Sequence, residues 1–178
     1  PLLGPLLLIV CGTGAYFNSL SGAFVFDDLT TIVTNPHLDH LWPPWKAGDS
    51  SLRLLLFYTL ALNRALGGQA PWSYHLVNLG LHLAASLVLY GLVRRCLALV
   101  PAYAPKAGAL ALATALIWCV HPLQTQSVTY IIQRGESMAS LFYLLTLYGV
   151  LRGAQAQTPS GFSGWYAVAA AAYYSGLA

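Results

Sequence analysis

The residues best suited to chemistry are two adjacent carboxylates, Asp27 and Asp28, near the start of the chain. Acids are scarce: the 178 residues include only five Asp and Glu, and Glu136 alone lies outside the stretch from Asp27 to Asp49. A carboxylate beside a long apolar segment is costly to place near lipid. Two interpretations follow. Either one of the pair caps a short loop helix through backbone N–H groups, or the pair supplies a general base or a ligand for a charged substrate group.

A second polar group follows a break in the apolar sequence at His121-Pro122. Arg134 precedes Glu136 by two residues. This spacing is compatible with a local ion pair that eases the start of a membrane helix. It is equally compatible with an arginine that binds an anion, because the guanidinium group fits phosphate oxygens with paired hydrogen bonds.

A third group consists of His75, Asn78 and His82, spaced three and four residues apart. This spacing predicts that they share one face of a helix. One interpretation is interhelical hydrogen bonding inside a bundle. The other is axial ligation of a haem or a chlorophyll-type metal by one histidine.

The composition indicates what kind of protein must position these groups. Hydrophobic residues make up 57% of the chain, charged residues 7%, and the mean hydropathy is +0.63, whereas soluble proteins carry about a quarter charged residues. The sequence therefore predicts an all-α integral membrane protein. The net charge of +3 arises without basic runs, so there is no footprint for nucleic acid. The three cysteines fit no metal or redox spacing and are interpreted as packing residues.

Apolar segments long enough for a bilayer predict about five spans. A first external loop at 21–73 separates the first two spans, and it carries the acidic motif and an amphipathic helix that begins at Arg53 and ends at Gly67-Gly68. Close helix contacts are expected at Gly12 and Gly14. Alternation of the spans puts this loop and the His121 turn on one face, outside the membrane. The predicted spans are Leu2–Leu20, Tyr74–Val93, Ala102–Val120, Met138–Leu151 and a segment from Trp165 onward.

The ordered set of motifs resembles the polytopic domain of the transmembrane and TPR repeat-containing O-mannosyltransferases and their bacterial relatives, within the GT-C superfamily. The resemblance rests on motifs in the same order and covers nearly the whole chain. They are Phe26-Asp27-Asp28, Asn35-Pro36, Leu62-Asn63, Leu66-Gly67-Gly68, Tyr74-His75-Leu76-Val77-Asn78 with His82, His121-Pro122 with Thr125 and Val128, and Arg134 with Glu136.

The resemblance implies a GT-C-like helix bundle and a glycosyltransferase that moves a sugar from a polyprenyl-phosphate donor to an acceptor hydroxyl, with inversion, on the external face. Asp27 or Asp28 is then the general base. The phosphate or lipid-donor residues are Arg53, Arg134, Glu136 and His121, and the polar residues inside the bundle are His75, Asn78 and His82. The arginines would offset charge on the departing phosphate.

Several expectations complete this interpretation. The range 1–178 is taken as one membrane domain that forms the N-terminal part of a longer module. Its partners are the lipid bilayer, the polyprenyl-phosphate sugar and an acceptor protein or glycan. No cofactor is assigned, although adjacent carboxylates can hold a divalent cation. The bacterial inner membrane is preferred over the endoplasmic reticulum.

Two alternatives remain open from the sequence. The first is a non-catalytic scaffold in a larger membrane complex, which would be indicated by carboxylates buried against a partner without a cavity beside them. The second is a haem- or pigment-binding subunit that uses His75, His82 or His121.

Overall fold

A computed structural model describes residues 2–43 and 53–177. Asp49, one of the five acids, lies outside them. The described residues form helices and turns without a strand, as the sequence predicts. The elements, in chain order, are α1 (Leu3–Tyr16), η1 (Phe17–Ser21), η2 (Leu29–Val33), η3 (Pro36–Asp39), α2 (Leu54–Gly67), α3 (Pro71–Ala98), η5 (Ala104–Lys106), α4 (Ala107–Val120), η6 (Pro122–Gln124), α5 (Thr125–Thr129), η7 (Ile131–Gln133), α6 (Arg134–Ala154) and α7 (Pro159–Leu177).

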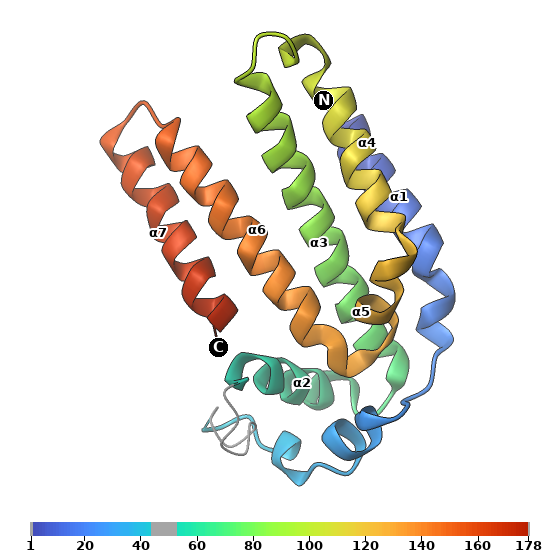
Figure 1. Cartoon of the computed structure of the whole chain (residues 1–178). Coiled ribbons are helices and arrows are strands. Elements are labelled where there is room, and N and C mark those ends of the chain that lie inside the picture. Colours follow the sequence, from blue (N-terminus) through green and yellow to red (C-terminus); the bar gives the residue numbers. More distant parts are fainter. Residues whose placement is uncertain (1, 44–52, 178) are drawn as a thin grey trace.

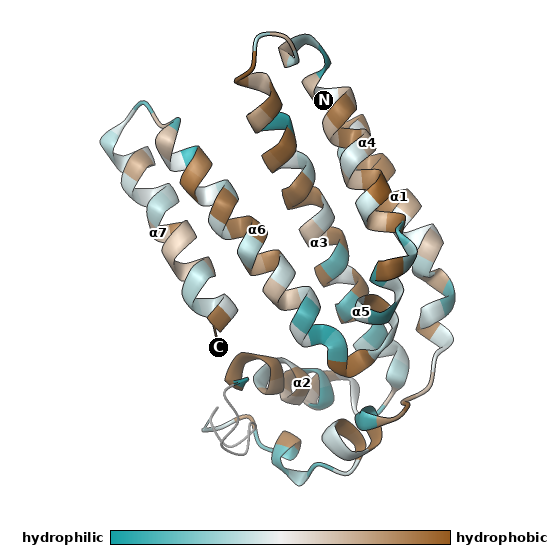
Figure 2. Cartoon of the chain, viewed as in Figure 1, coloured by the Kyte–Doolittle hydropathy of each residue, from teal (hydrophilic) through white to brown (hydrophobic). Residues whose placement is uncertain are grey.

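The long helices run roughly alongside one another, and α2 crosses beneath them at one end of the bundle (Figure 1). Helix α3 packs against α4, α6 and α1, and α6 packs against α7. The helices are apolar over most of their length, and hydrophilic residues gather where α3 and α6 begin (Figure 2). Large apolar side chains of α1, including Leu3, Leu6 and Val10, are exposed. An apolar outer face of this kind suits lipid surroundings.

In the described part of the chain, fewer helices than the five predicted spans are both long enough and apolar enough to cross a membrane. Within the described residues, the helical stretch Leu3–Ser21 and helix α3 are each long and apolar enough to cross a membrane. Ala104–Val120 and Pro122–Thr129 add a third span if this pair, bent by 50°, is counted as one. Helices α6 and α7 form where the fourth and fifth spans were predicted, but they do not reach the same apolarity, because polar and small residues interrupt both.

Close packing of α1 depends on one of the two glycines expected to provide it. A Cβ atom at Gly12 would lie 2.5 Å from Cδ2 of Leu83 and 2.8 Å from Sγ of Cys119. Gly14 has nothing within 4 Å of such an atom, so the prediction of a helix contact there is wrong. Helix α4 presents Ala107, Ala111, Ala115 and Cys119 to the interior, and these small side chains allow the helices to approach.

The first loop is folded against the bundle rather than extended from it. Ile32 and Leu38 of the loop share an apolar core with Leu60 of α2, Tyr74 of α3 and Ile131 of η7. Helix α2 starts beside Arg53 and ends at Gly67, followed by Gly68 with φ +62°, as the glycine pair predicts. The loop therefore contacts the segment after His121, as the predicted topology requires.

Candidate functional site

The two adjacent carboxylates lie in different surroundings. The side chain of Asp28 is fully buried, and its two oxygens accept hydrogen bonds from the backbone N–H groups of Val25 (3.2 Å) and Ile132 (2.9 Å). Asp28 also occupies the N-cap position of η2, but its side chain makes no capping bond there, so the capping interpretation does not describe it. Asp28 instead fastens the loop to η7.

Burial raises the pKa of Asp28 above its ordinary value. The N–H donors of Val25 and Ile132 and the nearby His75 ring oppose this shift, because each favours the ionised carboxylate. Burial is the larger influence, so the buried carboxylate takes up a proton more readily than an exposed one.

The side chain of Asp27 is exposed at the same turn. Its backbone N–H donates to the hydroxyl of Tyr130 (3.1 Å), and that hydroxyl also lies within reach of the Asp27 carboxylate. The ring of Tyr130 makes an edge contact with Phe26. Sequence reasoning missed Tyr130, because nothing in the local sequence indicates a contact across 103 positions.

Phe26 has an unusual backbone conformation directly before the pair. Its φ is +48°, which is rare for a bulky side chain and costs about 1–3 kcal/mol. The Asp28 bonds on one side and the Tyr130 contact on the other hold the turn in place. Strain of this kind is typical of a site that fixes the direction of a neighbouring side chain.

Arg134 is the largest fully buried side chain among the described residues. Its Nε donates to Oδ1 of Asn78 (2.8 Å) and its NH2 group to Oδ1 of Asn63 (2.8 Å). Two carbonyl oxygens, those of Thr59 (3.2 Å) and Tyr74 (3.2 Å), accept further bonds. The local ion pair with Glu136 is not formed. Arg134 instead joins α2, α3 and α6 through neutral acceptors.

The three polar residues of α3 face the interior, as their spacing predicts. Asn78 bonds Arg134 and also donates to the carbonyl of Ile131 (3.2 Å). Nε2 of His82 lies 2.8 Å from the carbonyl oxygen of Cys119, and its ring stacks on Trp118. These two contacts match the interhelical interpretation. His75 is 2% exposed, and neither ring nitrogen has a hydrogen-bond partner among the residues that the structure describes.

His121 and the cysteines have local roles. The exposed His121 accepts a hydrogen bond from the N–H of Leu123 through Nδ1 and so caps η6. Its role in binding the donor stays a prediction. Cys119 is buried in the α1–α4 contact, whereas Cys11 and Cys96 are exposed. The described residues hold no group of three His, Cys, Asp or Glu side chains placed for a metal ion.

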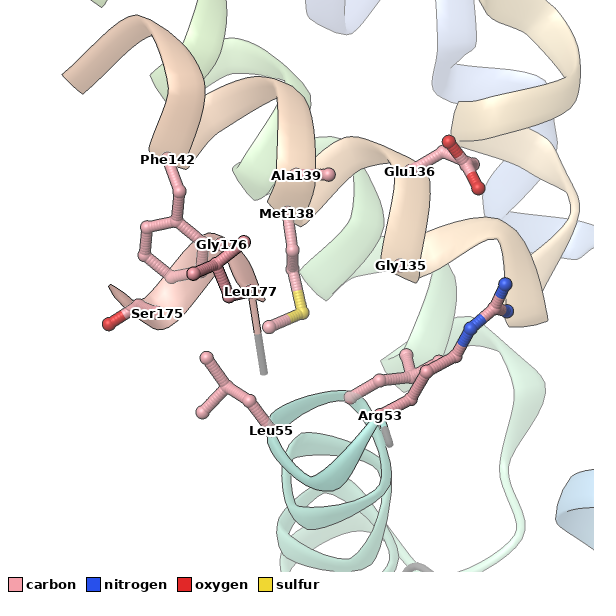
Figure 3. Close-up of a pocket in the computed structure, with 11 residues that line it drawn as sticks. Arg53, Leu55, Gly135, Glu136, Met138, Ala139, Phe142, Ser175, Gly176 and Leu177 are labelled. Atoms are coloured by element: carbon pink, nitrogen blue, oxygen red, sulfur yellow. The ribbon is translucent and has the colours of Figure 1, made fainter. Parts of the chain in front are cut away.

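A pocket of about 290 Å³ opens beside this network, between the starts of α2 and α6 and the end of α7. Arg53 and Glu136 line it together with apolar side chains such as Leu55, Met138 and Phe142. Figure 3 shows Arg53 and Glu136 on one side of the pocket and Leu55, Phe142 and Leu177 on the other. The structure thus brings two of the predicted donor-binding residues together, and Arg134 and His121 do not line this pocket.

One short segment connects these features. Tyr130 contacts Asp27, Ile132 bonds Asp28, and Arg134 holds α2 and α3. Glu136 then reaches the pocket. The segment 130–136 therefore contacts the exposed Asp27 and the buried Asp28, and its last residue lines the pocket.

Comparison with known proteins finds several protein O-mannosyl-transferases among the relatives of this chain. Protein O-mannosyl-transferase TMTC2 of Mus musculus is 31% identical over 185 residues, which is 92% of this chain and 21% of the relative. Protein O-mannosyl-transferase TMTC1 of Homo sapiens is 33% identical over 145 residues, 73% of this chain and 16% of the relative. The chain belongs to the TMTC family.

The match to TMTC3 of Homo sapiens, 30% identical over 161 residues, covers 82% of the chain and 16% of that protein. The chain thus spans about a fifth or less of the length of these TMTC proteins. No protein-family profile and no solved structure matches it. These three relatives are animal proteins, and they do not support the predicted bacterial inner membrane.

Proposed function

We propose that this chain contributes the acceptor-activating carboxylate and part of the donor pocket of a membrane glycosyltransferase. The donor would be a sugar linked to a polyprenyl phosphate, and the acceptor a hydroxyl group on a protein or glycan. Membership of the TMTC family supports transfer of a sugar, since the relatives are named O-mannosyl-transferases. The observation that carries the proposal is the different placement of the two adjacent carboxylates.

Asp27 takes the role of general base. Its side chain is exposed, whereas both oxygens of Asp28 are engaged by backbone N–H groups. Asp27 would accept the proton of the acceptor hydroxyl as that oxygen bonds the anomeric carbon. The bond between that carbon and the lipid phosphate breaks, and the phosphate leaves with the electron pair. Attack opposite to the leaving phosphate gives inversion.

The pocket would receive the donor near its phosphate. Arg53 is a cation at its rim and would offset charge on the leaving group. Apolar side chains such as Met138 and Phe142 suit the first isoprenoid carbons. Glu136 on the same pocket would accept hydrogen bonds from sugar hydroxyls.

Arg134, which the family resemblance assigns to the phosphate, serves the same reaction from inside the bundle in this proposal. It holds Asn63, Asn78 and the start of α6 in place. His121, the divalent cation, the GT-C arrangement, the external face and the bacterial or endoplasmic reticulum location stay predictions. Because Asp28 is fully buried and both of its oxygens accept N–H hydrogen bonds, Asp27 is the carboxylate of the pair that a cation would reach.

The test is a transfer assay on the full-length protein with polyprenyl-phosphate mannose. We expect Asp27→Asn to lower the rate about 100-fold or more, the range for loss of a general base, with an unchanged melting temperature. Asp39→Asn is the matched control, because it removes an exposed acid of the same loop that pairs with Arg64. It should leave the rate near that of the wild type.

If Asp27→Asn and Asp39→Asn both transfer sugar at the wild-type rate, the base assignment is wrong. If instead the wild type itself is inactive with every lipid-linked sugar tried, the scaffold hypothesis replaces the enzyme hypothesis. The anomeric configuration of the product, measured by NMR, tests inversion separately.

A further inference from the structure

Two adjoining cavities lie at the end of the bundle opposite the acidic loop. One, of about 330 Å³, is lined by Arg94, Arg95 and Tyr148. The other, of about 340 Å³, is lined by apolar side chains of α3, α6 and α7. Both include Gly91 and Tyr148, so the two cavities adjoin at these residues, and we call them together the α3–α6 groove.

The cationic part of the groove has no acidic partner within the described ranges. Arg95 donates to the hydroxyl of Tyr148 (3.3 Å) and to Oε1 of Gln155 (3.2 Å), both of which are neutral. Arg94 is exposed and makes no hydrogen bond or ion pair within the described part of the chain. The acids of residues 2–43 and 53–177 all lie in the first loop or at the start of α6.

The rest of this end is basic as well. Lys106 follows on η5, and Arg152, near the end of α6, places its guanidinium 4.4 Å from the ring centre of Trp165. Basic residues at the end of a helix complement its dipole. That effect accounts for the presence of Arg94 and Arg95, but not for a cavity beside them that adjoins an apolar cavity.

The groove joins a cationic mouth to an apolar floor. Leu87, Val88, Leu145 and Val168 supply the floor, with Trp165 beside them. A membrane chain with this combination is complementary to a molecule that carries a negative phosphate and a hydrocarbon chain. We propose that the α3–α6 groove binds an anionic phospholipid, with the phosphate at Arg94 and Arg95 and an acyl chain along the floor.

This site is separate from the proposed donor pocket, which lies at the other end of the bundle and shares none of its residues. The α3–α6 groove would bind an anionic lipid of the surrounding leaflet, whereas the donor pocket would bind the lipid-linked sugar. A lipid bound there would contact residues of α3, α6 and α7 at once.

The experiment measures binding of phosphatidylglycerol and phosphatidylcholine, with identical acyl chains, to the full-length protein by native mass spectrometry. We expect phosphatidylglycerol to bind preferentially. The double variant Arg94→Gln with Arg95→Gln should weaken its binding about 30-fold, from the usual effect of two cations near an anionic lipid. Lys106→Gln removes a charge at the same end outside the groove and should change binding little. Equal binding of the two lipids, or equal effects of the double variant and the control, would overturn the proposal.

A second variant tests the apolar floor and leaves both arginines in place. At Gly91 an added Cβ atom would lie 3.1 Å from the Tyr148 ring, so Gly91→Leu should fill the groove and weaken phosphatidylglycerol binding at least about tenfold. Gly80→Leu, on the same helix with open space around it, is the matched control. Glycerol phosphate, which lacks acyl chains, should fail to compete. Full binding by Gly91→Leu, or displacement of the lipid by glycerol phosphate at similar concentration, would indicate a site for small anions and refute the lipid assignment.

Discussion

Replacing Arg134 tests whether the charge or the planar shape of its side chain stabilises the helix bundle. The guanidinium reaches Oδ1 of Asn63 and Oδ1 of Asn78, each at 2.8 Å, from different nitrogens. In Arg134→Met both amide oxygens lose their donor inside the bundle. Each buried group left without a partner costs about 1–3 kcal/mol. Removing a buried cation returns part of this cost, so we expect a net loss of about 2–4 kcal/mol in the free energy of unfolding.

Arg134→Lys sharpens the test, because lysine keeps the charge and loses the planar fork. A single ammonium nitrogen does not reproduce the separate positions of Nε and NH2, so the bonds to Asn63 and Asn78 are weakened while the charge remains buried. We therefore expect Arg134→Lys to be no more stable than Arg134→Met. Arg94→Lys, on an exposed arginine that makes no such bonds, is the control and should change stability by less than about 0.5 kcal/mol.

The assay is reversible unfolding of the full-length protein in detergent, followed by tryptophan fluorescence and circular dichroism. Sugar transfer by the same variants is measured below their melting temperatures. If Arg134→Lys retains wild-type stability, the charge alone is sufficient and the argument from the fork is wrong. If Arg134→Lys is stable yet inactive, Arg134 acts on the substrate rather than on the helices.

Two further predictions concern stability. Burial raises the pKa of Asp28 in the folded protein above its value near 3.8 in the unfolded chain. The stability that the protonated side chain contributes is therefore complete below the unfolded pKa and is lost as the pH rises through the folded pKa. The unfolding free energy of the wild type relative to Asp28→Asn should thus fall as the pH rises from the unfolded to the folded pKa of Asp28. A rise over this pH range would contradict the argument from burial. Separately, Gly12→Ala should destabilise the protein by about 1–3 kcal/mol, since its Cβ would meet Leu83 and Cys119. Gly14→Ala, with open space, should be neutral in the same thermal melt.

Local signals in the sequence predicted the features that depend on neighbouring residues. Gly67 and Gly68 end α2 because a positive φ is needed there, and the glycine pair is visible in the sequence. The helix face shared by Asn78 and His82 follows from spacing alone. The all-helical architecture follows from apolar length.

The sequence did not separate Asp27 from Asp28, because their difference depends on Ile132, which lies 104 positions away from Asp28. It also offered an ion pair with Glu136 or an anion as the partner of Arg134, whereas tertiary packing buries the guanidinium among amide and carbonyl oxygens. The number of spans exceeded what the helices support by apolarity, since α6 and α7 contain many small and polar residues. The first two differences arise from contacts between distant segments, and the third from composition within each helix.

The hydrogen bond from Ile132 to Asp28 has a consequence for the order of folding. During synthesis, the first loop can pack on Leu60 of α2 and Tyr74 of α3 before residue 132 exists. Its bond to Ile132 must then close a further long stretch of chain, which carries its own entropic cost. Until then the Asp28 carboxylate lacks one of its two N–H donors. The turn at Asp27 and Asp28 therefore reaches its full set of hydrogen bonds only after η7 has been synthesised.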